Sequence, residues 1–363
     1  MKIDIIAGAR PNFMKIAPII DAIGVAQNEG KEIAYRLVHT GQHYDKNMSM
    51  SFFNDLGIPE PDVNLNCGGG SQAEQTANIM LRFESDMIEN PVDLVLVVGD
   101  VTSTLACSIV AKKMCTKVAH VEAGIRSGDL AMPEEINRMV TDSIADYFFT
   151  TSEVANHNLR TVGIAEERIF FVGNTMIDTL VRHRHNFRKP CFWEEFGLQH
   201  GRYLVVTLHR PANVDEQSKL MLLLHEIMIA SDPLPVVFPV HPRTAKILTD
   251  ADGYISRLHF VEPMGYLEFN YLVEHSTAVV TDSGGITEET SVLGIPCMTL
   301  RNSTERPETI SLGTNELLGT DPKALAPAMK ILFSDSWKKG GAIPLWDGKA
   351  ASRIVKHLLE DIN

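Results

Sequence analysis

The sequence predicts an α/β protein with two domains, each built on a parallel sheet of the Rossmann type. The chain has 363 residues, which suits two domains of the usual size of about 100–200 residues. Short apolar runs alternate with segments of helical length and spacing, as in chains of βαβ units. This alternation restarts after Pro190, so two complete series of units follow one another.

Most of the apolar runs are continuous rather than alternating in polarity. Parallel strands that helices cover on both faces have this pattern. In the first half we expect strands at residues 3–7, 34–38, 94–98, 118–121, 147–150 and 169–172. In the second half we expect them at residues 203–207, 236–240, 259–261, 278–281 and 297–300. Helical spacing is clearest at residues 103–113, 134–144, 219–230 and 348–361.

The boundary between the domains is expected within residues 184–201, a segment with Pro190, clustered charges and glycines. We therefore expect a first domain at residues 1–184, a second at 185–345, and a C-terminal helix within 346–363 that packs back on the first domain. Open parallel sheets bind ligands beside the carboxyl ends of their strands. Two such sheets predict two domains that face a cleft.

Charge and cysteine content exclude several classes of function. The chain has 33 Lys and Arg against 46 Asp and Glu, a formal net charge of −13. Nucleic acids and anionic membranes need a positive field, so neither is an expected partner. Five scattered cysteines without a CxxC pair argue against disulfides or zinc and favour a cytoplasmic location. The N-terminal run is not a signal peptide, and no apolar run is long enough to span a bilayer.

Motifs for nicotinamide cofactors and for nucleoside triphosphates are missing from the sequence. No GxGxxG occurs, and the looser GxGxxA at residues 68–73 follows a segment of alternating polarity instead of a buried strand. Neither the YxxxK pair of short-chain sugar-nucleotide epimerases nor a Walker A loop is present. We therefore expect neither a cofactor nor a metal.

Charged side chains follow several predicted strands of the first domain. Arg10 and Lys15 follow the first strand, Asp100 follows the third, and Glu122 follows the fourth. A charged side chain directly after an apolar strand is costly unless it is paired or has a function, which singles out Glu122. The alternative for Asp100 is that it caps the next helix. The alternative for Arg10 is that it is a solvated side chain beside a turn.

A third carboxylate, Glu134, belongs to the same group. Pro133 suits the first position of a helix, and acidic residues in a first turn favour the helix dipole. This is the alternative reading of Glu134 and Glu135. Asp100, Glu122 and Glu134 together make an acid/base set on neighbouring loops.

The strand ends of the second domain carry basic and glycine-rich segments. His209 and Arg210 follow one strand and His241 follows the next, which suits the binding of an anion, although a lone histidine there would be structural. The strongest local signal is the run TDSGGITEE at residues 281–289. Its helix start can bind a diphosphate, and a glutamate one turn into the helix can accept hydrogen bonds from two ribose hydroxyls. The alternative is a glycine turn with a capping serine.

The chain resembles the non-hydrolysing bacterial UDP-N-acetylglucosamine 2-epimerases. The resemblance rests on motifs in that family's order from residue 8 to residue 308: GARPNFMK, HTGQHYD, VVGDVTST, HVEAGIRSGD, PEEINR, TLHRP, PVHPR, DSGGITEE and RNSTERPE. It implies a GT-B-like fold of two Rossmann-type domains and a homodimer that binds nucleotide in the interdomain cleft. It also implies interconversion of UDP-GlcNAc and UDP-ManNAc for cell-surface polysaccharide precursors.

The resemblance also assigns roles to individual residues. It implies that Asp100, Glu122 and Glu134 are catalytic carboxylates of the first domain and that His209 is a functional histidine. It implies that Arg10 and Lys15 belong to the nucleotide-sugar loop and that the second domain binds UDP. The substrate-binding residues expected in the two domains are Arg10, Lys15, Arg138, Arg210, His241, Ser283, Gly284, Gly285, Glu289 and Arg306. Gln42, His43 and the Ser71-Gln72 loop match the region where some members bind a second, activating UDP-GlcNAc.

One motif departs from the family pattern. Many members have HRRE where this chain has Arg210 followed by Pro211-Ala212-Asn213. This puts the activating site in doubt and leaves open a modified UDP-N-acetylhexosamine, such as a 2,3-diacetamido uronic acid or a 6-deoxy sugar.

The proton on C2 of a GlcNAc unit is not α to a carbonyl, so its direct abstraction at neutral pH is implausible. The mechanism expected is elimination of UDP to a 2-acetamidoglycal, followed by re-addition. Carboxylates around the ring would move the proton and stabilise the cationic centre without NAD. The alternatives are a hydrolysing 2-epimerase, a GT-B glycosyltransferase and a catalytically inactive UDP-sugar-binding protein.

Overall fold

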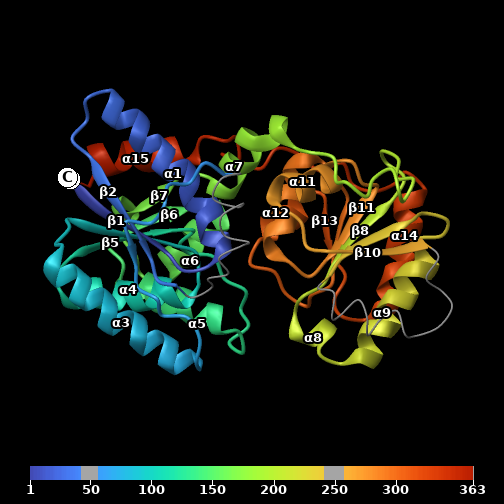
Figure 1. Cartoon of the computed structure of the whole chain (residues 1–363), viewed down its shortest axis with the longest axis horizontal. Helices are drawn as coiled ribbons and strands as arrows, with labels where there is room; N and C mark the ends of the chain where they lie inside the picture. Colours follow the sequence, from blue (N-terminus) through green and yellow to red (C-terminus); the bar gives the residue numbers. More distant parts are fainter. Residues whose placement is uncertain (42–55, 241–256, 363) are drawn as a thin grey trace. The chain divides into compact units, whose positions relative to one another are not determined.

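The computed structural model describes residues 1–41, 56–240 and 257–362. The chain forms two compact units, Met1–Arg182 with Pro344–Asn363 and His183–Ile343 (Figure 1). Each unit contains one parallel β-sheet with helices on both faces. The predicted α/β class with two parallel sheets is therefore confirmed.

The sheet of the first unit has seven strands in the order β3-β2-β1-β4-β5-β6-β7. All of its neighbouring strands pair in parallel. The chain moves outward from β1 through β2 to β3 and then returns to β4 beside β1, so the strand order reverses between β1 and β4. Ligands of open α/β sheets bind at such a switch point. The strands are β1 (Lys2–Ala7), β2 (Ala34–His39), β3 (Val63–Asn64), β4 (Leu94–Val98), β5 (Lys117–Val121), β6 (Tyr147–Thr150) and β7 (Ile169–Phe171).

Helices cover both faces of this first sheet. In Figure 1, α3, α4 and α5 lie on one face, while α1 and α15 lie on the other and pack against each other. Residues of α3 and α4 share a hydrophobic core with the strands beneath them. The helices of this unit are α1 (Arg10–Asn28), α3 (Gln72–Glu89), α4 (Thr102–Lys113), α5 (Pro133–Ile144), α6 (Glu153–Thr161), α7 (Thr175–His183) and α15 (Ala350–Glu360), with a 3₁₀ turn, η1 (Glu166–Arg168).

The sheet of the second unit repeats the topology of the first. Its strand order is β10-β9-β8-β11-β12-β13, with all pairs parallel and the switch point between β8 and β11. The strands are β8 (Leu204–Thr207), β9 (Val236–Pro239), β10 (Leu258–Val261), β11 (Ala278–Thr281), β12 (Cys297–Thr299) and β13 (Asn315–Leu317). The helices are α8 (Pro211–Val214), α9 (Gln217–Ala230), α11 (Tyr266–Glu274), α12 (Gly284–Leu293), α13 (Pro307–Ser311) and α14 (Leu325–Phe333), with 3₁₀ turns η2 (Arg184–Asn186) and η4 (Pro322–Ala324).

The first strand of the second unit shows why the apolar runs are continuous. Leu204 and Val206 belong to a core shared with α9 and α14. Val205 points to the opposite face, where it joins a core that contains Trp193 and Leu272. Both faces of the strand are buried, and each fully buried side chain of this kind contributes about 1.5–3 kcal/mol.

The C-terminal segment returns to the first unit. Asp178 on α7 accepts hydrogen bonds from the backbone amides of Ala350 (3.0 Å) and Ala351 (2.7 Å) at the start of α15. The indole of Trp346 donates to the carbonyl of Thr151 (2.9 Å). Backbone amides at a helix start have no partner within the helix, so Asp178 fixes the point at which α15 begins.

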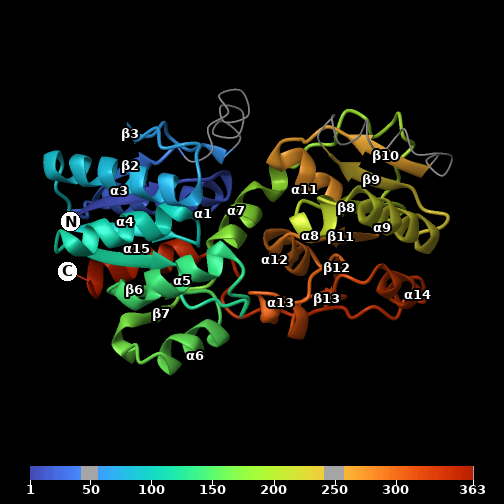
Figure 2. The same cartoon turned by 90° about the horizontal axis from the view of Figure 1, so that it is seen from below.

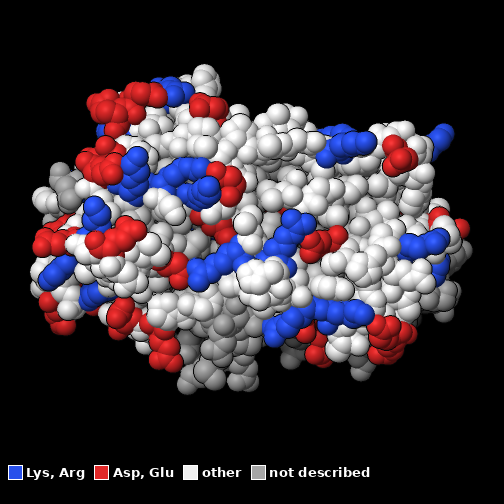
Figure 3. All heavy atoms as spheres, turned by 90° about the horizontal axis from the view of Figure 1, so that it is seen from above, with Lys and Arg blue, Asp and Glu red and all other residues white. Residues whose placement is uncertain are grey.

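The surface charges are mixed on the face that Figure 3 shows. Lys and Arg side chains are interspersed with Asp and Glu over the described residues of that face. None of the described helices combines the length and apolar character needed to cross a bilayer.

Candidate functional site

The predicted residues of the first unit lie at the switch point of its sheet. The chain leaves β1 and enters α1 at Arg10, and Lys15 follows on that helix. Asp100 follows β4 and Glu122 follows β5, the two strands next along the sheet. The topology therefore brings these loops to one edge, as the strand-end argument predicts. The side chain of Arg10 lies outside the described part of the structure.

Glu122 is a buried carboxylate in a strained backbone position. Its carboxylate forms an ion pair with the ammonium group of Lys15 on α1. Glu122 is only 1 % exposed, and its φ of +67° lies in the left-handed region that non-glycine residues rarely adopt. Such strain persists where the surroundings enforce it, and it clusters at functional sites. The charge of Glu122 is thus paired, which is one of the two outcomes that the sequence argument allows.

Gly99 brings this ion pair next to Asp100. A Cβ built on Gly99 would lie 3.1 Å from Oε2 of Glu122 and 3.3 Å from Nζ of Lys15. Gly99 also has a φ of +69°. The left-handed backbone favours glycine at this position, and an added Cβ would push the two charged groups by a few tenths of an ångström.

Gly99→Ala is expected to reduce turnover strongly because the added methyl group displaces the Lys15–Glu122 pair. The matched control is Gly30→Ala, since Gly30 has a φ of +81° with no atom within 4 Å of a built Cβ. Both variants should lose about 1–2 kcal/mol of stability to the left-handed backbone, which thermal or urea unfolding measures. Equal turnover in the two variants would contradict this account of Gly99.

Asp100 is held by α5. The guanidinium of Arg138 donates to Oδ2 of Asp100 from Nε (3.0 Å) and Nη2 (2.5 Å), and its Nη1 donates to Glu135 (2.6 Å). The amide of Asn137 donates to the carbonyl of Asp100 (2.8 Å). The residue at the N-cap of α4 is Val101, without a side-chain cap. Asp100 is therefore not a helix cap, and its carboxylate is fixed by Arg138 instead.

The two acidic residues at the start of α5 have different environments. Pro133 opens the helix, as predicted. Glu135 is buried, and burial alone would raise its pKa, but the amides of Ser127 and Gly128 and the Arg138 guanidinium hold the pKa below its usual value. Glu134 is half-buried and has no hydrogen bond or ion pair with the described residues. Of the three predicted catalytic carboxylates, Glu134 is thus the one without a fixed partner in the described part of the chain.

Beneath the Asp100 loop lies a buried histidine that the sequence argument left without a role. His120 contacts the carboxylate of Asp142 through Nδ1 (2.7 Å) and the carbonyl of Gly99 through Nε2 (2.8 Å). Both ring nitrogens of His120 therefore face hydrogen-bond acceptors. Asp142 also pairs with Arg126 (2.6 Å). The signal in the sequence was a histidine inside an otherwise apolar strand.

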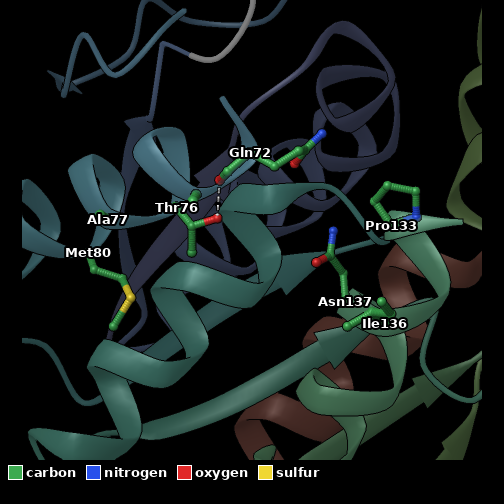
Figure 4. A pocket seen from close by; sticks show the side chains of 8 residues that line it. Gln72, Thr76, Ala77, Met80, Pro133, Ile136 and Asn137 are labelled. Carbon is green, nitrogen blue, oxygen red and sulfur yellow. Dashed lines mark hydrogen bonds between the residues drawn. The ribbon is translucent and has the colours of Figure 1, made fainter. Parts of the chain in front are cut away.

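Residues of α3 and α5 line a largely apolar groove (Figure 4). The amide of Asn137 in its wall holds the carbonyl of Asp100, and the amide oxygen of Gln72 accepts a hydrogen bond from Thr102 (3.2 Å). Ser71, which precedes Gln72, caps α3 together with Glu74. The groove has a volume of about 390 Å³ and is lined by Gln72, Ala73, Thr76, Ala77, Met80, Pro133, Ile136 and Asn137.

In the second unit the predicted residues also lie at the switch point. His209 and Arg210 follow β8, and Asp282 follows the adjacent strand β11. Nδ1 of His209 lies 2.7 Å from the buried carboxylate of Asp282. Nε of Arg210 donates to the carbonyl of Asp282 (3.0 Å). Asp282 was not among the predicted site residues, because its partner is 73 residues away in the sequence.

The glycine turn is the start of α12. The helix begins at Gly284, and the hydroxyl of Ser283 at its N-cap makes no capping bond. A Cβ built on Gly284 would lie 2.6 Å from Oε1 of Glu305, so a larger residue here would displace the Glu305 carboxylate. Gly285 follows within the first turn, where helix amides have no partner in the helix.

Glu289 lies further along α12, and its side chain is buried. No hydrogen bond to its Oε1 is formed by the described residues. Burial raises the pKa of Glu289 to about 7 against the lowering effect of Tyr266 and Asn270, and the neighbouring Glu288 adds to the rise. A buried carboxyl oxygen without a hydrogen bond is costly, so Glu289 is suited to accept one from a ligand.

The remaining predicted residues are placed as follows. Arg306 is buried, and its Nε donates to Glu288 on α12 (2.7 Å). Arg301, which the sequence argument did not single out, pairs with Glu305 (2.6 Å). The predictions for Gln42, His43 and His241 lie outside the described residues.

The chain matches the model of a known family over most of its length. The family model for UDP-N-acetylglucosamine 2-epimerase matches residues 26–359. The chain belongs to this family.

Individual relatives agree with the family match over almost the whole chain. The UDP-N-acetylglucosamine 2-epimerase of Methanocaldococcus jannaschii is 39 % identical, with 99 % of each chain covered. The crystal structure of that enzyme in complex with UDP-GlcNAc and UDP has a TM-score of 0.88 with this chain and covers 99 % of both. A UDP-2,3-diacetamido-2,3-dideoxy-D-glucuronate 2-epimerase of Pseudomonas aeruginosa is 37 % identical, again with 99 % of each chain covered. The fold of this epimerase-family chain is GT-B-like, as the resemblance implies.

Proposed function

We propose that this chain interconverts UDP-GlcNAc and UDP-ManNAc by inverting C2, through elimination of UDP to a 2-acetamidoglycal and its re-addition. The observation that carries the proposal is the buried Lys15–Glu122 pair beside the Asp100 loop, at the switch point of an epimerase-family sheet. A buried, strained and paired carboxylate is suited to proton transfer.

The carboxylates of the first unit perform the sugar chemistry. As UDP leaves C1, positive charge develops on the ring and the C2 proton becomes acidic. Asp100, Glu122 and Glu134 then move this proton and stabilise the charge. Arg138 holds Asp100 in place, while Arg10 and Lys15 contribute positive charge beside the nucleotide sugar.

The second unit holds the nucleotide. The start of α12, with Ser283, Gly284 and Gly285, offers helix amides to the diphosphate. Arg210 adds a cation, and Glu289 accepts hydrogen bonds from the ribose hydroxyls. His209 acts at the diphosphate, and His241 and Arg306 complete the substrate-binding set.

UDP affinity is expected to fall as the pH is lowered below about 7, because ribose hydroxyls bind best to the ionised form of Glu289, whose pKa is about 7. Protonation below that pH removes an acceptor, and the affinity should fall by up to about tenfold per pH unit. Calorimetric titration from pH 8 to 5.5 measures this. The terminal phosphate of UDP titrates near pH 6 and adds its own pH dependence to the affinity. Glu289→Gln is the control, because it keeps the effect of the phosphate and removes that of Glu289. Identical slopes in both proteins would contradict this role of Glu289.

We also propose that the enzyme works in the cytoplasm as a homodimer and supplies precursors of surface polysaccharides. The activating site around Gln42 and His43 belongs to the same proposal. Substrate activation would appear as sigmoidal dependence of the rate on UDP-GlcNAc concentration.

The proposed reaction is tested by NMR of the purified protein with UDP-GlcNAc in D₂O, without added NAD or acceptor. UDP-ManNAc with deuterium at C2 is the expected product. Free ManNAc with UDP would move the chain to the hydrolysing 2-epimerases. Absence of any turnover without an acceptor would favour a different UDP-sugar, a GT-B glycosyltransferase or a UDP-sugar-binding protein.

A second candidate substrate is a UDP-2,3-diacetamido uronic acid. Two observations favour it: the 37 % identity to the Pseudomonas aeruginosa 2-epimerase, and the Arg210-Pro211-Ala212-Asn213 segment that departs from HRRE. The same NMR assay with both substrates compares their kcat/KM values. A higher value for the uronic acid would replace UDP-GlcNAc as the proposed substrate.

A further inference from the structure

Asp282 is a buried carboxylate surrounded by hydrogen-bond donors. It accepts bonds from the backbone amides of His209 (3.1 Å) and Arg210 (2.9 Å) and from the side-chain amide of Asn213 (3.0 Å). Nδ1 of His209 is a further contact at 2.7 Å. Burial alone would raise the pKa of Asp282, but the bonds from His209 and Asn213 hold it below its usual value. The group is therefore an acceptor at neutral pH, and Nδ1 must be the donor.

This contact fixes which nitrogen of His209 is available to a ligand. The His209 side chain is 61 % exposed within the chain, while Asp282 is completely buried. With Nδ1 tied to Asp282, a neutral ring has its proton on Nδ1 and a lone pair on Nε2. A carboxylate that orients a histidine in this way determines its tautomer.

We infer that Asp282 is a positioning residue for the reaction, which acts by holding His209 as the Nδ1–H tautomer with Nε2 turned away from the protein. This inference rests on the proposed function, in which His209 acts at the diphosphate of the substrate. When the C1–O bond breaks, its electron pair stays on the diphosphate oxygen, and that oxygen attacks C1 again on re-addition. As the bond breaks, Nε2 of the doubly protonated ring gives its proton to that oxygen, which leaves the ring as the neutral Nδ1–H tautomer. On re-addition Nε2 takes the same proton back from the oxygen as the oxygen attacks C1.

Asp282→Asn tests the inference because it reverses the tautomer with almost no change in volume. Two amide donors, those of Arg210 and Asn213, face Oδ2, so the oxygen of the new amide takes that place. Its NH₂ group then faces Nδ1 of His209, which must become an acceptor. The neutral ring has its proton on Nε2 and can no longer accept one there.

The expected kinetic result is a fall in kcat of about 10²-fold or more, with UDP affinity close to that of the wild type. The combined His209→Asn and Asp282→Asn variant should lose no more activity than His209→Asn alone, because residues that act through one another are not additive. Thr207→Val, which removes a hydrogen bond between the same two strand ends, is the control and should keep near-wild-type turnover.

¹⁵N NMR of histidine-labelled protein gives a readout that does not depend on turnover. His209→Asn identifies the ring signals, which should report Nδ1–H in the wild type and Nε2–H in Asp282→Asn. The inference is overturned if the variant keeps Nδ1–H, if its kcat is near that of the wild type, or if the two substitutions are additive. A wild type that converts neither UDP-sugar would overturn the proposed function instead, and the nitrogen signals would still decide whether Asp282 sets the tautomer.

Discussion

Glu122→Gln is expected to lower kcat by about 10²–10⁴-fold, the usual contribution of a positioned acid or base. Glutamine has the same shape and can still accept a hydrogen bond from Lys15, so the site should keep its geometry. It cannot take a proton from C2 or balance positive charge on the ring. The measurement is the rate at which deuterium appears at C2 in D₂O.

Two comparisons isolate the effect of the Glu122 carboxylate. UDP affinity should stay near the wild-type value, since we assign the nucleotide to residues of the second unit. Glu84→Gln makes the same chemical change at an exposed position on α3 and should leave the rate unchanged. Full activity of Glu122→Gln would remove Glu122 from the proposed mechanism.

Arg138→Leu is expected to lower the free energy of unfolding by about 3–5 kcal/mol, the usual result of removing one partner of a buried ion pair. Arg138 is only 2 % exposed and contacts both Asp100 and Glu135. Its loss leaves both carboxylates without their cation, and Asp100 without its anchor. Turnover should therefore fall together with stability.

The matched control is Arg160→Leu. Arg160 pairs with Glu166 at the surface, where the two side chains are 42 % and 64 % exposed. Such exposed pairs contribute about 0–1 kcal/mol. Urea unfolding of both variants measures the difference, and similar losses for Arg138 and Arg160 would show that the buried network does not stabilise the fold as described.

The sequence predicts the strands well where they are long and buried. The run Leu94–Val98 has the bounds of β4, and the predicted strand 3–7 differs from β1 by one residue. The edge strands β3 and β13 were not predicted. Their sequences, Val-Asn and Asn-Glu-Leu, are short and contain polar residues, so neither forms an apolar run. The GxGxxA segment follows β3, which is only half-buried, and not the first strand of the unit.

The candidate site is predictable in its residues but not in its pairings. Because ligands meet parallel sheets at strand ends, Asp100 and Glu122 can be identified from where their strands stop. Their partners cannot be identified in this way, since Lys15 is 107 residues from Glu122 and Arg138 is 38 residues from Asp100. Asp282 was missed for the same reason, because only the pairing of β8 with β11 brings it to His209.

The return of the chain to the first unit determines the order in which the protein can be completed during synthesis. The second unit is continuous in sequence, whereas the first needs α15, which is made after the whole second unit. Until Ala350 and Ala351 leave the ribosome, Asp178 lacks its two amide donors and the face of α1 that α15 covers stays open to water. Domains usually fold as they emerge, the N-terminal one first. Here the unit that starts first is finished last, so the nascent chain displays an incomplete apolar surface throughout the translation of the second unit.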